Sequence, residues 1–127
     1  SKQTPRMPQG RHPKYTKTRL AIALLLREPQ LAQYALAEDQ LNKLSATPGV
    51  PLLIELLDII QAETSLTSSA LIERFHGRPE YPILQKLILW ELPDMDNREL
   101  SFRKTMERFN EDIRRIGYDS FIEQDPT

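Results

Sequence analysis

Side chains that could perform acid–base or metal chemistry are few in this sequence and lie far apart. The chain has two histidines, His12 and His76, and no cysteine. A metal site or a catalytic triad built on histidine needs several partner side chains close together, and no ligand set accompanies either histidine in the sequence. We therefore interpret His12 as a linker residue and His76 as a surface or capping residue at the end of a helix.

Asp94 and Asp96 have the spacing of a carboxylate pair that could hold magnesium. A magnesium site usually needs more carboxylates or substrate phosphates, and Asp96 can instead cap the helix that follows it, so the capping interpretation is favoured. Gly49 and Gly77 are isolated, which excludes a glycine-rich phosphate-binding loop. We predict no catalytic site, metal or cofactor within these 127 residues.

Charge is distributed unevenly along the chain, although the formal net charge is only -1. Residues 1–27 contain seven Lys and Arg residues and no acid, which leaves ten basic and eighteen acidic residues in 28–127. Any polyanion should therefore meet the N-terminal edge, because the acidic remainder would repel it. The cluster Lys14, Lys17 and Arg19 could bind phosphates or an acidic peptide, or could simply belong to a soluble basic linker. Only Tyr15 lies among these cations, which gives little support for stacking on single-stranded nucleic acid.

Helices must position these residues. Residues 1–14 are rich in proline and poor in apolar residues, which indicates a linker from a longer polypeptide. A helix is predicted from Thr16 or Thr18, either of which can cap it, to Glu28. Its segment 20–26 leaves no polar face, so we expect this helix to be buried on all sides at the centre of a small bundle.

Further apolar segments recur at helical spacing. Pro29 suits the first position of a short helix, and a third helix with a wide apolar face is predicted over 51–62. Thr67 and Gly77 fit the N-cap and the left-handed C-terminal residue of a fourth helix, and a fifth is predicted over 81–91. The predicted core consists of Ile22, Leu25, Leu26, Leu53, Leu56, Leu57, Leu71, Phe75, Leu84, Leu87 and Ile88.

The last predicted helix begins at a capping box formed by Asp96 and Glu99. An apolar stripe then follows at the heptad spacing of a helix that packs along another helix: Phe102, Met106, Phe109, Ile113 and Ile116. Beyond Gly117 the pattern shifts to three apolar residues with no core left to enter, Tyr118, Phe121 and Ile122. They either contact another segment or a partner helix, or belong to a frayed terminus.

These patterns predict an all-α fold, a compact bundle of about six helices in which the last is long and projecting. The expected organisation is a flexible basic linker over 1–14, a helical bundle over 15–98 and a C-terminal arm over 99–127. No apolar run is long enough to span a membrane and no secretory leader is visible. Together with the lack of cysteine, this favours a cytoplasmic protein without a membrane partner.

Part of the sequence resembles a known family. The segments that carry the resemblance are TRLAIALLLREPQLA, SLTSSALIERFHG and LQKLILWE, in this order and at these distances. Together they resemble the C-terminal, helicase-binding domain of the bacterial replicative DNA primase, over about residues 14–121. The resemblance implies a helical bundle similar to the N-terminal domain of the hexameric replicative helicase, followed by a long helix and a terminal hairpin that anchors primase to helicase.

The resemblance also implies how the two partners bind. Ile116, Tyr118, Phe121 and Ile122 would form the arm that faces the helicase. The chain ends at Thr127, about where the rest of the hairpin would follow, so we expect the chain alone to bind helicase weakly or not at all. The family docks the acidic tail of single-stranded-DNA-binding protein in a basic site, whose matching residues here are Lys14, Thr16, Thr18, Arg19 and Lys86.

Catalysis is expected elsewhere in the parent protein. In this family the zinc-binding and RNA-polymerase domains precede the helicase-binding domain, and nothing in the present chain matches them. The resemblance therefore attributes primer synthesis, a nucleotidyl transfer, and any zinc or magnesium to other domains of a DNA primase.

Two other interpretations remain beside this protein-interaction module. One is a helical nucleic-acid-binding module that uses the basic N-terminal arm directly, and the other is a helical domain of an unrelated polymerase accessory protein. Direct binding of random oligonucleotides by the arm should weaken steeply as salt rises. The interaction module should instead show little affinity for nucleic acid and measurable affinity for an acidic peptide, whereas the accessory domain should show neither.

Overall fold

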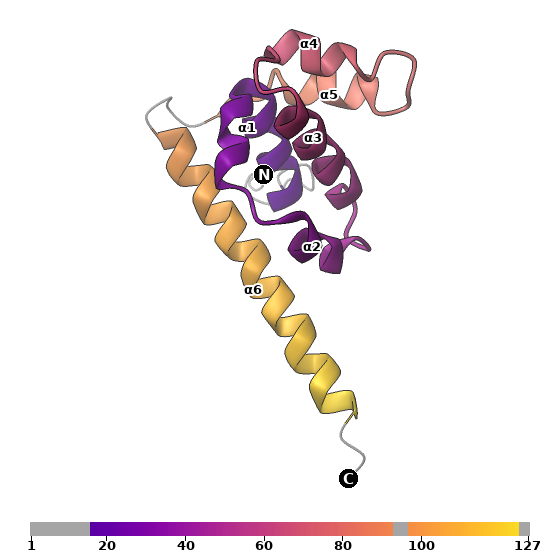
Figure 1. The fold of residues 1–127 in the computed structure, drawn as a ribbon, viewed down its shortest axis with the longest axis vertical. Helices are drawn as coiled ribbons and strands as arrows, with labels where there is room; N and C mark the ends of the chain where they lie inside the picture. Colours follow the sequence, from indigo (N-terminus) through magenta and orange to yellow (C-terminus); the bar gives the residue numbers. More distant parts are fainter. Residues whose placement is uncertain (1–15, 93–96, 125–127) are drawn as a thin grey trace, which may run out of the picture.

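The computed structural model describes residues 16–92 and 97–124, with side chains as far as Asp119. Within these ranges every regular element is helical, which confirms the all-α prediction (Figure 1). The elements are α1 (Lys17–Arg27), η4 (Pro29–Tyr34), α2 (Glu38–Leu41), η5 (Asn42–Leu44), α3 (Val50–Ala62), α4 (Ser68–Glu73), α5 (Tyr81–Leu87) and α6 (Arg98–Gln124). The predicted linker 1–14, with Lys14, and the aspartates Asp94 and Asp96 lie outside the described residues.

Helix α1 lies at the centre of the bundle. Residues 21–26 are all buried, and α3, α4, α5 and α6 each pack against this helix. Thr16 is the N-cap, and its hydroxyl oxygen accepts a hydrogen bond of 3.2 Å from the backbone N–H of Arg19. The predicted central position of α1 is confirmed, because a helix that is apolar on every side gains most when other helices cover all of it.

Short helical turns connect α1 to α3. Pro29 begins η4 as predicted, since the first helical position needs no N–H donor. The sequence does not predict α2 and η5, because both are brief and mostly polar, and they bury Leu41 and Leu44 respectively. Gly49 then caps α3 with a left-handed φ of 91°. The apolar face of α3 packs on α1 as its periodicity predicts.

Helices α4 and α5 pack on each other and on α1 at one end of the bundle (Figure 1). The predicted caps are confirmed: the Thr67 hydroxyl oxygen accepts from the N–H of Ala70 at 3.2 Å, and Gly77 has a φ of 86°. Both helices end earlier than predicted. After α5, the Arg27 side chain donates to the carbonyl oxygens of Ile88 and Trp90 at 2.9 and 2.8 Å, which holds this segment in a turn.

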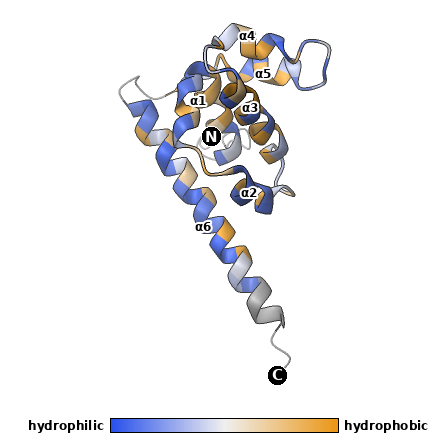
Figure 2. Ribbon diagram, in the orientation of Figure 1, coloured by the Kyte–Doolittle hydropathy of each residue, from blue (hydrophilic) through white to orange (hydrophobic). Residues whose placement is uncertain are grey.

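Helix α6 has 27 residues and begins against the bundle but does not end there. The buried part of its stripe consists of Phe102, Met106, Phe109 and Ile113. Ile116 is 47% exposed, so the prediction that it packs with the stripe is wrong. The physical reason is that α6 continues through Gly117 and extends past the other helices, so the bundle does not cover this part of it (Figure 1). Figure 2 shows apolar and polar residues interleaved along it, as on a helix with one covered face.

Two ion pairs fix α6 against the two ends of α1. Arg98 contacts Glu28 at 3.3 Å, and Asp112 contacts Lys17 at 3.1 Å. The side chains of Arg98 and Glu28 are only 11% and 23% exposed, so solvent screens their interaction less than that of a surface pair. The two pairs and the buried stripe between them together set the position of α6 along α1.

The predicted core is confirmed except at Ile88, which is partly buried. Its remaining members form a single cluster with the buried stripe of α6. No helix in the described part of the chain is long and apolar enough to cross a membrane.

We expect Leu25→Ala to lower the free energy of unfolding by about 2 to 5 kcal/mol. Leu25 is fully buried in α1, so the smaller side chain loses apolar burial and leaves a cavity. Leu89→Ala is the matched control because Leu89 is 80% exposed, and its effect should be about 0.5 kcal/mol or less. Urea unfolding followed by circular dichroism measures both variants. Equal stabilities would contradict the central position of α1.

Candidate functional site: a groove between α1 and α5

An open groove of about 540 Å³ lies between the start of α1 and the end of α5. Arg19 contributes from α1, and the residues after Tyr81 supply the rest of the lining: Ile83, Lys86, Leu87, Leu89 and Trp90. We call this site the α1–α5 groove. Ile83 and Leu89 are 46% and 80% exposed, which is unusual for large apolar side chains beside a well-formed core.

Local sequence explains the lining of the groove. Leu84 and Leu87 turn one face of α5 into the core, so Ile83 and Lys86, at helical spacing from each other, lie on the side toward Arg19. The first turn of α1 contains no acid to neutralise Arg19. Among the described residues, neither Arg19 nor Lys86 belongs to an ion pair. The groove therefore combines an apolar floor with two available cations.

Two of the other predicted peptide-binding residues, Thr16 and Thr18, do not line this groove. Thr16 has a structural role, because its side chain caps α1. Thr18 is 2% exposed and lies against Gly49, where a Cβ added to the glycine would come within 2.9 Å of the Thr18 methyl carbon. Its predicted surface role must therefore be corrected: Thr18 packs inside the bundle and helps to position the start of α1. Lys17 of the basic cluster is already paired with Asp112.

Sequence reasoning missed the apolar part of the groove. A signal was present, because the segment 83–90 contains six large apolar residues, more than one face of a short helix can bury. Periodicity alone could not show which of them remain at the surface. Which of these residues stay exposed depends on which part of α5 is covered by α1.

The residues predicted to face helicase lie at the other end of the molecule, on the projecting part of α6 (Figure 1). Ile116 and Tyr118 are 47% and 66% exposed. Phe121 and Ile122 belong to the same helix, but their side chains lie outside the described residues. Both are exposed side chains on the part of α6 that lies away from the α1–α5 groove, and their i,i+2 spacing places them on different sides of the helix.

The described residues expose a cationic, apolar groove and a projecting helix. They contain no group of three or more His, Cys, Asp and Glu side chains able to hold a metal ion. The ring of His76 packs edge-on against Tyr81, with ring centroids 5.2 Å apart, as a structural residue at a helix end would. A helical bundle with a cationic apolar groove and a projecting helix is the arrangement expected of a protein-interaction domain.

Comparison with known proteins identifies the family. The model of the family described as DNA primase DnaG DnaB-binding matches residues 18–125. The chain belongs to this family, which confirms the resemblance found in the sequence. It is thus the DnaB-binding domain of a DNA primase, which is a non-catalytic domain.

Individual relatives agree with this assignment. Over 115 residues, the chain is 28% identical to a DNA primase of Salmonella typhimurium and 25% identical to one of Escherichia coli K12, covering 90% of the chain in each case. The match spans 20% of the length of these curated relatives. A solved DnaG primase C-terminal domain from Vibrio cholerae has the same fold, with a TM-score of 0.75 at 23% identity over 87% of this chain and 86% of that one.

We expect Gly49→Ala to destabilise the protein more than Gly77→Ala. Both glycines have positive φ values, of 91° and 86°, so both substitutions strain the backbone, at about 1 to 2 kcal/mol each. Only at Gly49 would the new Cβ also meet Thr18, since nothing lies within 4 Å of the corresponding position at Gly77. Chemical unfolding measures the difference. Equal losses would show that the contact between α3 and the start of α1 has no energetic role.

Proposed function

We propose that this chain couples a bacterial DNA primase to two partners at the replication fork in the cytoplasm. The projecting arm of α6 binds the replicative helicase DnaB, and the α1–α5 groove receives the acidic C-terminal tail of single-stranded-DNA-binding protein. The parent polypeptide makes RNA primers with other domains. The observation that carries the proposal is membership of the DnaB-binding family over 18–125, combined with an exposed apolar arm.

The contents of the α1–α5 groove support the acidic-tail assignment. A peptide that carries carboxylates and an apolar residue would gain from Arg19 and Lys86 at the rim and from the apolar floor between them. An acid-free first turn of α1 adds to the attraction, because the N-terminal end of a helix favours negative charge. The two kinds of contact together favour an acidic peptide with an apolar end over a simple anion.

The exposed surface of α6 supports the helicase assignment. Ile116 and Tyr118 lie beyond the part of the helix that the bundle covers, so a partner could contact either side chain without disturbing the core. Tyrosine contributes strongly at protein interfaces because it buries a large area with little loss of side-chain entropy.

Direct binding of nucleic acid has less support. The remainder of the chain, 28–127, contains ten basic and eighteen acidic residues and would repel phosphates. Within the basic cluster, Asp112 already neutralises Lys17. We therefore expect little affinity for random oligonucleotides.

We expect Arg19→Glu with Lys86→Glu to abolish binding of an acidic tail peptide. The double variant replaces two attractive charges at the groove by two repulsive ones. Lys104→Glu with Arg108→Glu is the matched control, since it makes the same charge change at exposed positions of α6. Fluorescence anisotropy of a labelled peptide measures affinity, and circular dichroism checks the fold. Wild-type affinity in the first variant would place the peptide site elsewhere.

We also expect Ile116→Glu with Tyr118→Glu to weaken helicase binding by at least about tenfold, the effect of losing roughly 1.4 kcal/mol of binding free energy. Both side chains are exposed, so the thermal melting temperature should not fall. Surface plasmon resonance against immobilised helicase at high chain concentration measures the change. Lys104→Gln with Arg108→Gln is the control, because it also changes the net charge by -2 at exposed positions of the same helix. Unchanged binding in the apolar variant would show that the arm does not contact helicase.

A further inference from the structure

A second groove lies between the η4–α2 segment and α3. It consists of two adjoining hollows of about 340 and 290 Å³, which share Ala32, Gln33 and Gln61. We call it the η4–α3 groove. Its residues differ entirely from those of the α1–α5 groove, and none of them lies on α6. Neither function proposed above uses this surface.

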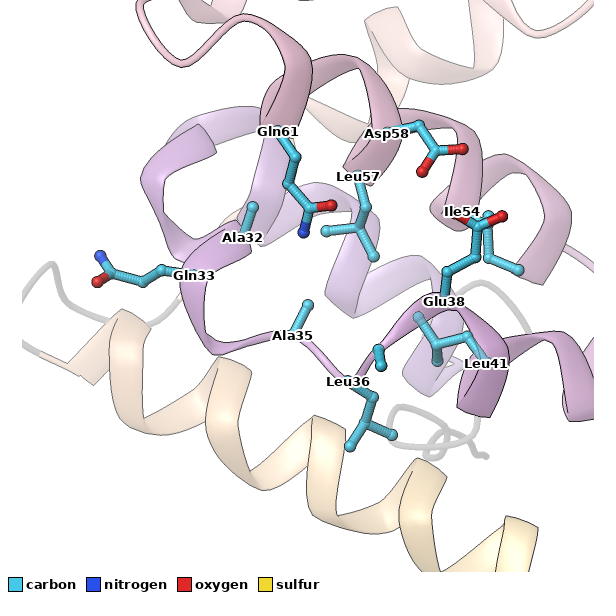
Figure 3. Close-up of a pocket in the computed structure, with 11 residues that line it drawn as sticks. Ala32, Gln33, Ala35, Leu36, Glu38, Leu41, Ile54, Leu57, Asp58 and Gln61 are labelled. Atoms are coloured by element: carbon cyan, nitrogen blue, oxygen red, sulfur yellow. The ribbon is translucent and has the colours of Figure 1, made fainter.

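The floor of the η4–α3 groove is apolar and its rim is polar. Ala32, Leu36 and Leu57 border the larger hollow, and the amide of Gln61 points into it (Figure 3). Glu38 reaches from α2 toward Asp58 on α3 at one end of this hollow (Figure 3). The two carboxyl groups are thus at the edge of an apolar depression large enough for one or two side chains of a partner.

The carboxyl groups of Glu38 and Asp58 lack a cationic partner among the described residues. Acids at other helix contacts are paired, as Glu28 is with Arg98 and Glu55 with Arg78. The neighbouring carboxyl group of Asp58 raises the pKa of Glu38, through side-chain hydrogen bonding to the protonated form and through charge repulsion. Two adjacent carboxylates without a cation favour any ligand that brings one.

We propose that the η4–α3 groove docks an apolar segment of a partner protein that carries an arginine. The guanidinium group would bridge the carboxylates of Glu38 and Asp58, because its planar fork can donate to two acceptors at once. A neighbouring apolar side chain of the same segment would enter the hollow beside Leu57. Charge complementarity selects this occupant over an acidic peptide, and the apolar floor selects it over a free cation.

Binding of a labelled peptide to the whole chain tests the proposal. The probe is a capped peptide with one Arg between two Leu residues at helical spacing, in a background of Ala and Ser. The control peptide has citrulline in place of Arg, which keeps the shape and removes the charge. We expect the Arg peptide to bind at least about tenfold more tightly than the citrulline peptide. Equal affinities would overturn the proposal.

Variants of the chain test whether the Arg peptide binds in the η4–α3 groove. Glu38→Gln with Asp58→Asn should remove the preference for Arg, and both positions are exposed, so the fold should persist. The matched control is Glu91→Gln with Glu111→Gln, which makes the same change in net charge at exposed sites outside the groove. An equal loss in both variants would show general attraction to an acidic protein and would overturn the proposal. Self-association abolished by the first variant would overturn it too, by identifying a second copy as the occupant.

Discussion

The burial of α1 on every side is the constraint on which the rest of this structure depends. A helix with apolar residues throughout 21–26 can be stable in water only when neighbours cover all its faces. Four other α-helices pack against it, and none of them alone could cover it. The bundle therefore requires its short helices, α4 and α5, as much as the long ones. A short helix contributes little stability by itself, so these elements depend in turn on packing against α1.

Polar groups at the two ends of α1 then determine which surfaces become available. At its start, Lys17 contacts Asp112 of α6, which leaves Arg19 as the cation that faces α5. At its end, Arg27 holds the turn that follows α5, and Glu28 contacts Arg98 at the beginning of α6. Surface ion pairs contribute little stability individually. Their role here is geometric, because each fixes a neighbouring element relative to the same central helix.

Different parts of the resulting molecule stabilise the fold and present exposed surfaces for binding. The bundle buries one continuous core, whereas large apolar side chains remain exposed in the α1–α5 groove and on the projecting part of α6. A projecting helix is accessible to a partner without any rearrangement of the bundle, and the groove lies apart from it. This arrangement suits a domain of the DNA primase DnaG DnaB-binding family, whose role in the parent protein is connection and not chemistry.

Sequence alone determined the features that depend on a few neighbouring residues. The cap at Thr67, the central position of α1 and the buried stripe of α6 follow from local hydrogen bonding and helical periodicity, and three correlated segments indicate the family. For the cap of α1 the sequence left Thr16 and Thr18 open, and the structure decides for Thr16. Tertiary structure decided the rest. Ile116 has the same spacing as the buried stripe but is exposed, because the bundle ends before it. Arg19 and Lys86 are far apart in the sequence and line one groove only because α5 packs beside the start of α1. Periodicity specifies which face of a helix is apolar, but only the position of the other helices determines whether that face is covered.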